Sequence, residues 1–240
     1  MSTAPLTRTD VIKRAWPLVF ANAAVPLAGV ADTFVLGLSG DTADLGGVAL
    51  GSAVFSVFYW SFYFLRMGTT GLTAQADGAG DIAEAQRILL RALAIASLLG
   101  LLIWGLRDAI SWVGFAVLQG TSAVEDKGAD YLLARAWGAP AALATFALSG
   151  WLIGLGRNGA TLALYVVFSL TNIGLDLWFV LGLGYGPGGV GAATAIAEWV
   201  GLAVGLVFVA LALRQQGGWA EGATGRARLM EPGALREMFQ

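Results

Sequence analysis

Residues 189–213 read GVGAATAIAEWVGLAVGLVFVALAL, a run in which Glu198 is the one charged side chain. An α-helix rises about 1.5 Å per residue, so about 20 predominantly apolar residues are enough to cross the roughly 30 Å hydrocarbon core of a bilayer. The run is long enough and apolar enough to do so. It therefore predicts a transmembrane helix.

The same criterion predicts six transmembrane helices along the whole chain. They fall roughly at 14–38, 46–76, 87–110, 131–154, 159–183 and 189–213. The composition agrees, because 57% of the 240 residues are hydrophobic, 12% are charged and the mean hydropathy is +0.72, well outside the range of a soluble domain. We expect an all-α membrane protein in which residues 1–213 form a six-helix bundle and residues 214–240 a cytoplasmic linker.

The basic residues of the connections gather on one side of these helices. That side holds Arg8, Lys13, Arg14, Arg87, Arg91, Arg157, Arg214, Arg226, Arg228 and Arg236. The other side has, on it or near it, Arg107, Lys127 and Arg135. By the positive-inside rule the first side is cytoplasmic, so we expect a multi-pass protein of the plasma (inner) membrane with both termini in the cytoplasm.

The absence of cysteine and histidine excludes several kinds of chemistry. Disulfides, thiol catalysis, cysteine-histidine zinc sites and histidine-dependent triads cannot be built from this chain. Two membrane aspartates could form a protease dyad, but the Tyr-Asp and Gly-x-Gly-Asp motifs of such enzymes are absent, since the acids follow Ala31 and Leu175. The net charge of −2 and the scattered bases give no nucleic-acid patch. We expect neither an enzyme nor a protein with a resident cofactor.

Three acids, Asp32, Asp176 and Glu198, lie inside the predicted helices at about 9 to 13 Å from the same membrane face. An acid at the centre of a membrane helix costs about 2.5 to 3.5 kcal/mol, so three at one depth predict a shared polar cavity. Asn172 precedes Asp176 by one turn and lies on the same helical face. Two structural alternatives stay open: Asn172 and Asp176 could bond across to neighbouring helices, and Glu198 could extend to the outer interface.

Arg66 and two prolines are the other notable residues inside the predicted helices. We expect Arg66 to hold the bundle together through backbone carbonyls or an acid. Pro17 and Pro26 each remove a backbone hydrogen bond from the first helix, which bends such helices. Pro26 is the better candidate for a hinge, since Pro17 could lie in the first turn.

Four stretches resemble one known family. They are PLAGVADT (26–33), FLRMGTTGLTAQ (64–75), GWLIGLGR (150–157) and NIGLD (172–176). Together they resemble the multidrug and toxic compound extrusion (MATE) transporters, specifically the DinF-type branch, and FLRMGTTGLTAQ is the most specific of them. The resemblance covers essentially the whole chain, as the amino-terminal six-helix lobe of a twelve-helix transporter with two lobes.

This resemblance implies an antiporter, coupled to H⁺ or Na⁺, that exports small organic or toxic compounds. Asp32 would be the coupling site, Asn172 and Asp176 would complete its polar network, and sodium would bind to these three. Burial and like charge would favour a proton on Asp32 or Asp176. Pro17 would lie where some members bend the first helix. The expected partners are membrane lipid, the substrate, and a carboxy-terminal lobe or second chain.

Two alternative functions stay open at this point. One is a flippase for a lipid-linked molecule within the same superfamily, which a cationic groove would favour, whereas an aromatic and acidic cavity would favour drug export. The other is a half-protein that inserts into the membrane without transporting.

Overall fold

A computed structural model of the chain describes residues 8–39, 41–220 and 223, and over these residues the fold is all helical. Most of the predicted linker 214–240 lies outside this description. The elements in chain order are α1 (Arg8–Ser39), α2 (Thr42–Phe62), α3 (Phe64–Gly78), α4 (Ile82–Gly105), α5 (Arg107–Leu118), α6 (Ser122–Ala136), α7 (Ala139–Gly154), α8 (Asn158–Asp176), η1 (Leu177–Gly182) and α9 (Pro187–Gln215).

Successive helices combine into membrane-length spans. Within the described residues five spans are long and apolar enough to cross a bilayer, and a sixth results if α6 and α7, bent by 54°, are taken as one. In the count of six, the second span is α2 with α3, Thr42–Gly78, and the fifth is α8 with η1, Asn158–Gly182. The predicted all-α membrane class is confirmed, and the count of six agrees roughly.

The third and fourth helices differ in their bounds from the approximate ranges predicted. Instead of 87–110, the chain forms α4 from Ile82 and adds the short helix α5 after it. Instead of beginning at residue 131, the fourth helix begins at Ser122 and breaks before Ala139. The first half of α6 is rich in charged residues, so a search for apolar runs does not find it. This half nevertheless packs in the bundle, where its Lys127 forms an ion pair of 3.0 Å with Asp44 of α2.

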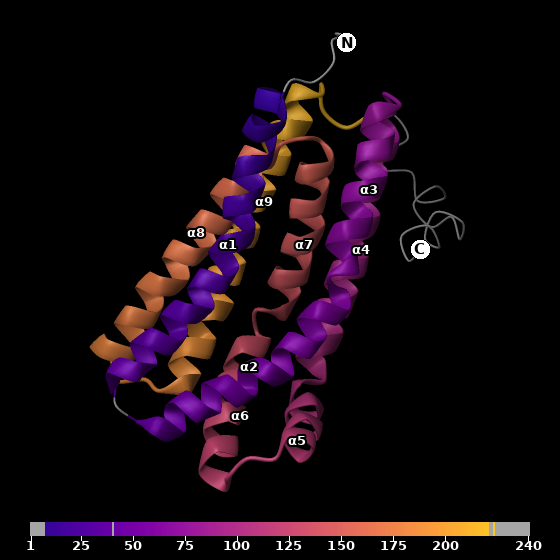
Figure 1. Cartoon of the computed structure of the whole chain (residues 1–240). Helices are drawn as coiled ribbons and strands as arrows, with labels where there is room; N and C mark the ends of the chain where they lie inside the picture. Colours follow the sequence, from indigo (N-terminus) through magenta and orange to yellow (C-terminus); the bar gives the residue numbers. More distant parts are fainter. Residues whose placement is uncertain (1–7, 40, 221–222, 224–240) are drawn as a thin grey trace.

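Figure 1 shows α1, α8 and α9 running side by side, with α7 between them and the α3–α4 pair. Small residues allow α7 to approach α3 closely. A Cβ atom at Gly150 would lie 2.6 Å from the backbone carbonyl oxygen of Arg66, and one at Gly154 would lie 2.6 Å from Cβ of Thr73. Glycine at these positions therefore fixes the separation of the two helices, and with it the place of Arg66.

Candidate functional site

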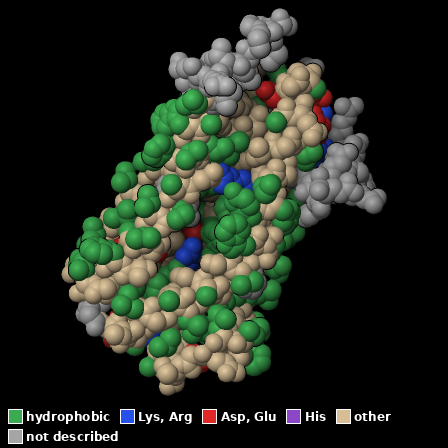
Figure 2. Space-filling model, in the orientation of Figure 1, with side chains coloured by type: hydrophobic (Ala, Val, Ile, Leu, Met, Phe, Trp, Pro, Cys, Tyr) green, Lys and Arg blue, Asp and Glu red, His purple; other side chains and the backbone are tan. Residues whose placement is uncertain are grey.

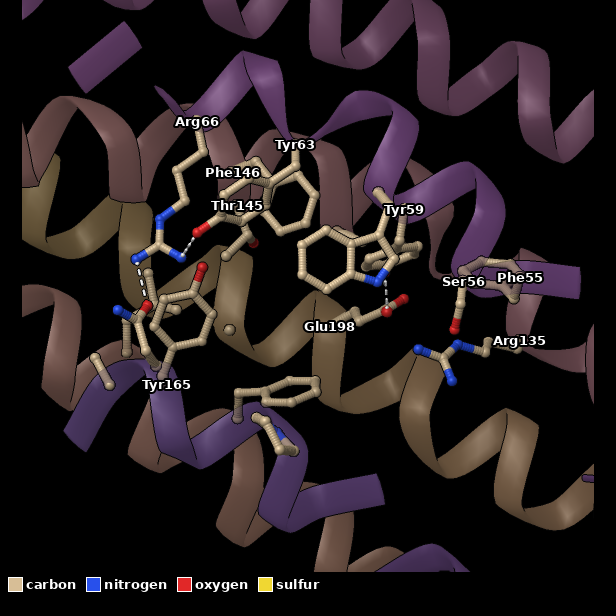
Figure 3. Close-up of a pocket in the computed structure, with 18 residues that line it drawn as sticks. Phe55, Ser56, Tyr59, Tyr63, Arg66, Arg135, Thr145, Phe146, Tyr165 and Glu198 are labelled. Atoms are coloured by element: carbon tan, nitrogen blue, oxygen red, sulfur yellow. Dashed lines mark hydrogen bonds between the residues drawn. The ribbon is translucent and has the colours of Figure 1, made fainter. Parts of the chain in front are cut away.

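A cavity of about 420 Å³ lies inside the bundle, lined by residues of α1, α2, α3, α6, α7, α8 and α9. Figure 2 shows basic side chains recessed between hydrophobic ones on the front face of the molecule. Seven of the 18 residues that line the cavity are aromatic: Phe55, Tyr59, Trp60, Tyr63, Phe146, Tyr165 and Phe168. Figure 3 shows Arg66 at one end of this space and Arg135 with Glu198 at the other.

Arg66 binds neutral side chains. Its guanidinium donates hydrogen bonds to Asn22 Oδ1 (3.0 Å) and to the Tyr63 hydroxyl (3.1 Å). It lies 5.6 Å from the ring centroid of Tyr63 and 5.5 Å from that of Tyr165. No acid in the described part of the chain is within ion-pair distance. The predicted partners, backbone carbonyls or an acid, are therefore wrong, although Arg66 does connect α3 to α1.

Glu198 points into the protein. The residue is 5% exposed, it lines the cavity, and its Oε1 accepts a hydrogen bond from the Tyr59 hydroxyl. A Cβ atom at Gly138 would collide with Glu198 Oε2, so glycine there makes room for the carboxylate. The alternative in which Glu198 extends to the outer interface is wrong, because a partner hydroxyl and a space were available inside.

Arg135 is the residue that the sequence analysis missed. The sequence places it on or near the outer side, but its guanidinium lines the cavity, 4.7 Å from the Phe55 ring centroid and 5.5 Å from that of Tyr59. It donates a hydrogen bond to the Tyr131 hydroxyl, one turn earlier on α6. The spacing Tyr131-x-x-x-Arg135 is a signal for this pairing, since residues four apart share a helical face.

Asp32 of α1 and Asp176 of α8 lie against each other, and Asn172 completes the group. Asp32 is 6% exposed, and the other two are fully buried. Asp32 Oδ1, Asn172 Oδ1 and both carboxylate oxygens of Asp176 accept no hydrogen bond from any described residue. Asn172 Nδ2 donates to Thr194 Oγ1 of α9 (3.3 Å), and the Asn172 side chain also hydrogen-bonds the Asp32 carboxylate. Four acceptor oxygens of this group nevertheless have no donor among the described residues.

The predicted acids fall in two neighbouring places rather than in one cavity. Asp32, Asn172 and Asp176 form a cluster between α1 and α8, which we call the carboxyl pair site, whereas Glu198 lines the aromatic cavity. Arg135 connects them, because its charge acts on Asp32, on Asp176 and on Glu198. Acceptor oxygens with no donor suit a proton or a Na⁺ ion, so the residues fit either coupling ion.

Both prolines of interest lie within α1. Because α1 begins at Arg8, Pro17 is internal to the helix and does not lie in its first turn. Pro26 lines the aromatic cavity and precedes Asp32 by about one and two-thirds helical turns. Both therefore remove a hydrogen bond from a helix that contributes to both sites.

The comparison with known proteins agrees with this arrangement. The family model named MatE matches residues 17–178, most of the chain and all of α2 to α7. The chain belongs to the MatE family. It is therefore a transporter-family protein and not an enzyme.

Three relatives show how far the likeness extends. DNA damage-inducible protein F of Escherichia coli (strain K12) is 40% identical over 88% of this chain and 47% of its own length, which confirms the resemblance to the DinF-type branch. Multidrug resistance protein MdtK of Cronobacter sakazakii is 28% identical over 80% of this chain and 42% of its own length. The solved structure of a MOP superfamily transporter from Pyrococcus furiosus matches with a TM-score of 0.81 at 22% identity, over 96% of this chain and 50% of that one, and shows the shared fold.

The chain spans about half the length of these relatives. It corresponds to the amino-terminal half of a longer MATE protein. The family relationship and the membrane-length helices together make it a multi-pass membrane protein.

Proposed function

We propose that this chain is the amino-terminal lobe of a cation-coupled antiporter that exports organic compounds across the plasma membrane, with both termini in the cytoplasm. One observation carries the proposal: the carboxyls of Asp32 and Asp176 lie buried in contact, and Asp32 Oδ1 and both Asp176 oxygens have no donor among the described residues. The name of the Cronobacter sakazakii relative, a multidrug resistance protein, supports export as the direction of transport.

The carboxyl pair gives a physical route from ion binding to helix movement. With one proton between them the two carboxyls attract each other, and α1 packs against α8. When the proton leaves, two negative charges are in contact in a region of low dielectric, where at about 4 Å they repel by about 4 kcal/mol for an effective dielectric of 20. Loss of the proton therefore favours separation of α1 from α8, a movement that can expose a site to one side of the membrane.

We propose a proton as the coupling ion. A sodium ion is the alternative, and it would replace the proton by binding the free oxygens of Asp32, Asn172 and Asp176. Transport driven by a pH gradient or by a sodium gradient distinguishes proton coupling from sodium coupling.

A second candidate function is a flippase for a lipid-linked molecule, favoured by the two arginines that line the cavity, Arg66 and Arg135.

We further propose that a second lobe or chain is required, because transporters built from repeats bind substrate between the repeats. Expression of residues 1–240 with and without a carboxy-terminal lobe addresses this point: the account requires efflux only when both are present.

The test of the proposed function is ion-driven dye transport in proteoliposomes, using a transporter that contains this lobe. Asp32→Asn should abolish transport driven by a pH gradient, because the amide cannot exchange a proton. Asp126→Asn, an exposed acid of α6, is the matched control and should transport like the wild type. The yield after detergent extraction checks folding.

Wild-type transport under a sodium gradient alone would assign coupling to sodium. If Asp32→Asn transports at the wild-type rate under either gradient, Asp32 is not the coupling acid, and Glu198 becomes the next candidate.

A further inference from the structure

The charge of the aromatic cavity is opposite to that which an organic cation requires. Arg66 and Arg135 line it against one acid, Glu198. Charged side chains at membrane depth are normally paired, because an unpaired charge there is costly. Arg66 has only neutral partners, Asn22 and Tyr63, among the described residues. Its positive charge therefore faces the cavity without an acid to balance it.

A second unsatisfied group lies at the same end. Thr145 of α7 is 8% exposed, it lines the cavity, and its Oγ1 has no hydrogen-bond partner among the described residues. Figure 3 shows Thr145 on the Arg66 side of the cavity, beside Tyr63. Nearly all buried polar groups in native proteins have a partner, so an orphaned hydroxyl beside a guanidinium points to a ligand that supplies acceptor oxygens.

The opposite end differs in its charge. Arg135 shares this end with the Glu198 carboxylate, and the charges of Asp32 and Asp176 also act on it, although it forms no ion pair within 4.0 Å with a described residue. The space between the two arginines is walled by aromatic rings, with Tyr59 and Phe146 in edge contact at 5.5 Å and Tyr63 and Phe146 at 5.8 Å. Such walls bind flat apolar groups.

We propose that this cavity binds a small amphipathic anion. Its carboxylate, sulfonate or phosphate group would accept hydrogen bonds from Arg66 and Thr145, and its aromatic body would lie along the rings toward Arg135. The volume of about 420 Å³ is typical of small-molecule sites. The inference rests on the proposed function in one respect only, in taking the bound molecule to be the transported one.

The test is equilibrium binding to the purified 240-residue chain in detergent, which needs no ion gradient. The probes are 1-pyrenebutyrate and the matched cation 1-pyrenebutylammonium, with fluorescence corrected for protein-free micelles. The anion should bind about tenfold or more tightly than the cation. Arg66→Gln should weaken binding of the anion about tenfold or more and leave that of the cation unchanged or stronger, because a charge-assisted hydrogen bond contributes about 1.5 to 3 kcal/mol.

Two further variants keep the proposal testable if Arg66→Gln folds poorly. Thr145→Val keeps the shape of the side chain and should weaken binding of the anion about two- to tenfold. Arg66→Lys keeps the charge but loses the two-pronged geometry, and should retain the preference for the anion with lower affinity. The matched control is Arg107→Gln, which removes the same charge from a residue outside the cavity and should bind both probes as the wild type does.

Equal affinity for the two probes, or unchanged binding of the anion by both Arg66→Gln and Thr145→Val, would overturn the proposal.

Competition identifies the source of the anion. Displacement by dioctanoyl phosphatidate at lower concentration than by a soluble aromatic carboxylate assigns the site to a lipid headgroup, and the reverse order assigns it to a soluble compound. Anion binding without ion-driven transport would leave this inference standing while the proposed coupling fails.

Discussion

The contact between two carboxyls makes the state of each depend on the other. Asp32 and Asp176 share a buried space in which Asp32 Oδ1 and both Asp176 oxygens have no donor among the described residues, so a single proton or cation between the carboxyls would serve both. The Asn172 side chain hydrogen-bonds Asp32 and also donates to Thr194 Oγ1, but it leaves these three oxygens without a donor. We therefore expect the pair to exchange a single proton as one unit, with Arg135 as the nearby positive charge.

Replacement of Asp176 should impair coupling less than replacement of Asp32. In Asp176→Asn the new amide can donate to the unpartnered Asp32 oxygen, and Asp32 stays able to exchange a proton. We expect pH-gradient-driven transport to fall roughly three- to tenfold, the size of one altered hydrogen bond. Initial rates in proteoliposomes, normalised to extracted protein, measure this. A complete loss in Asp176→Asn beside normal transport in Asp32→Asn would exchange the roles of the two acids.

Sequence reasoning finds the acids but not the arginine. Asp32, Asp176 and Glu198 stand out because each interrupts an apolar run, and Asn172 stands out through its spacing from Asp176. Arg135 follows a charged stretch of α6, and in the sequence alone this stretch resembles a connection between helices. Only the packing of α6 against α2 and α9 brings its guanidinium to the acids, and one sequence cannot give that contact.

At the scale of elements, the α7–α3 contact holds Arg66 in place. Gly150→Ala would put a Cβ atom 2.6 Å from a backbone oxygen of α3, so the helices must separate. Overpacking of this kind typically costs about 1 to 3 kcal/mol. We expect a lower thermal unfolding midpoint in detergent and a lower yield. The matched control is Gly71→Ala on the exposed side of α3, where a Cβ atom meets nothing within 4 Å.

The control should be neutral or slightly stabilising, because alanine favours a helix over glycine. Equal stability of Gly150→Ala and Gly71→Ala would show that the close approach of α7 and α3 is not needed.

The start of α4 shows how far local signals reach. Asp81 caps the helix by accepting a hydrogen bond of 2.8 Å from the Glu84 backbone N–H. Glu84 does not complete a capping box, because its carboxylate binds Arg87 at 2.6 Å and Arg91 at 2.8 Å, and the Asp81 N–H donates to the Ala76 carbonyl. The helix cap can be predicted from the sequence, because it depends on residues close together along the chain. The partner of the Glu84 carboxylate cannot, because basic residues one and two turns later compete for it.

At the scale of the molecule, six spans could be predicted because the length of a bilayer crossing is fixed and apolar runs of that length are easily recognised. The break between α2 and α3 could not, because the sequence carries no proline there. The 54° bend between α6 and α7 does have a local cause, since Pro140 lies in the first turn of α7 and cannot donate the hydrogen bond that would continue α6. The result is a bundle with two adjoining sites, the carboxyl pair site between α1 and α8 and the aromatic cavity beside it. Ion binding at the first can alter the second through α1, which contributes Asp32 to one and Pro26 to the other.

The most direct test of this account is infrared difference spectroscopy of the purified chain, because a protonated carboxyl buried away from water has a carbonyl band separate from that of a carboxylate. The account predicts that the wild-type chain has a protonated carboxyl band, which disappears as the pH is raised. Asp32→Asn and Asp176→Asn should each change or remove this band. Asp126→Asn should leave it intact. A band that is identical in the wild type, Asp32→Asn and Asp176→Asn, or one that is absent from the wild type throughout, would contradict the claim that this pair holds the coupling proton.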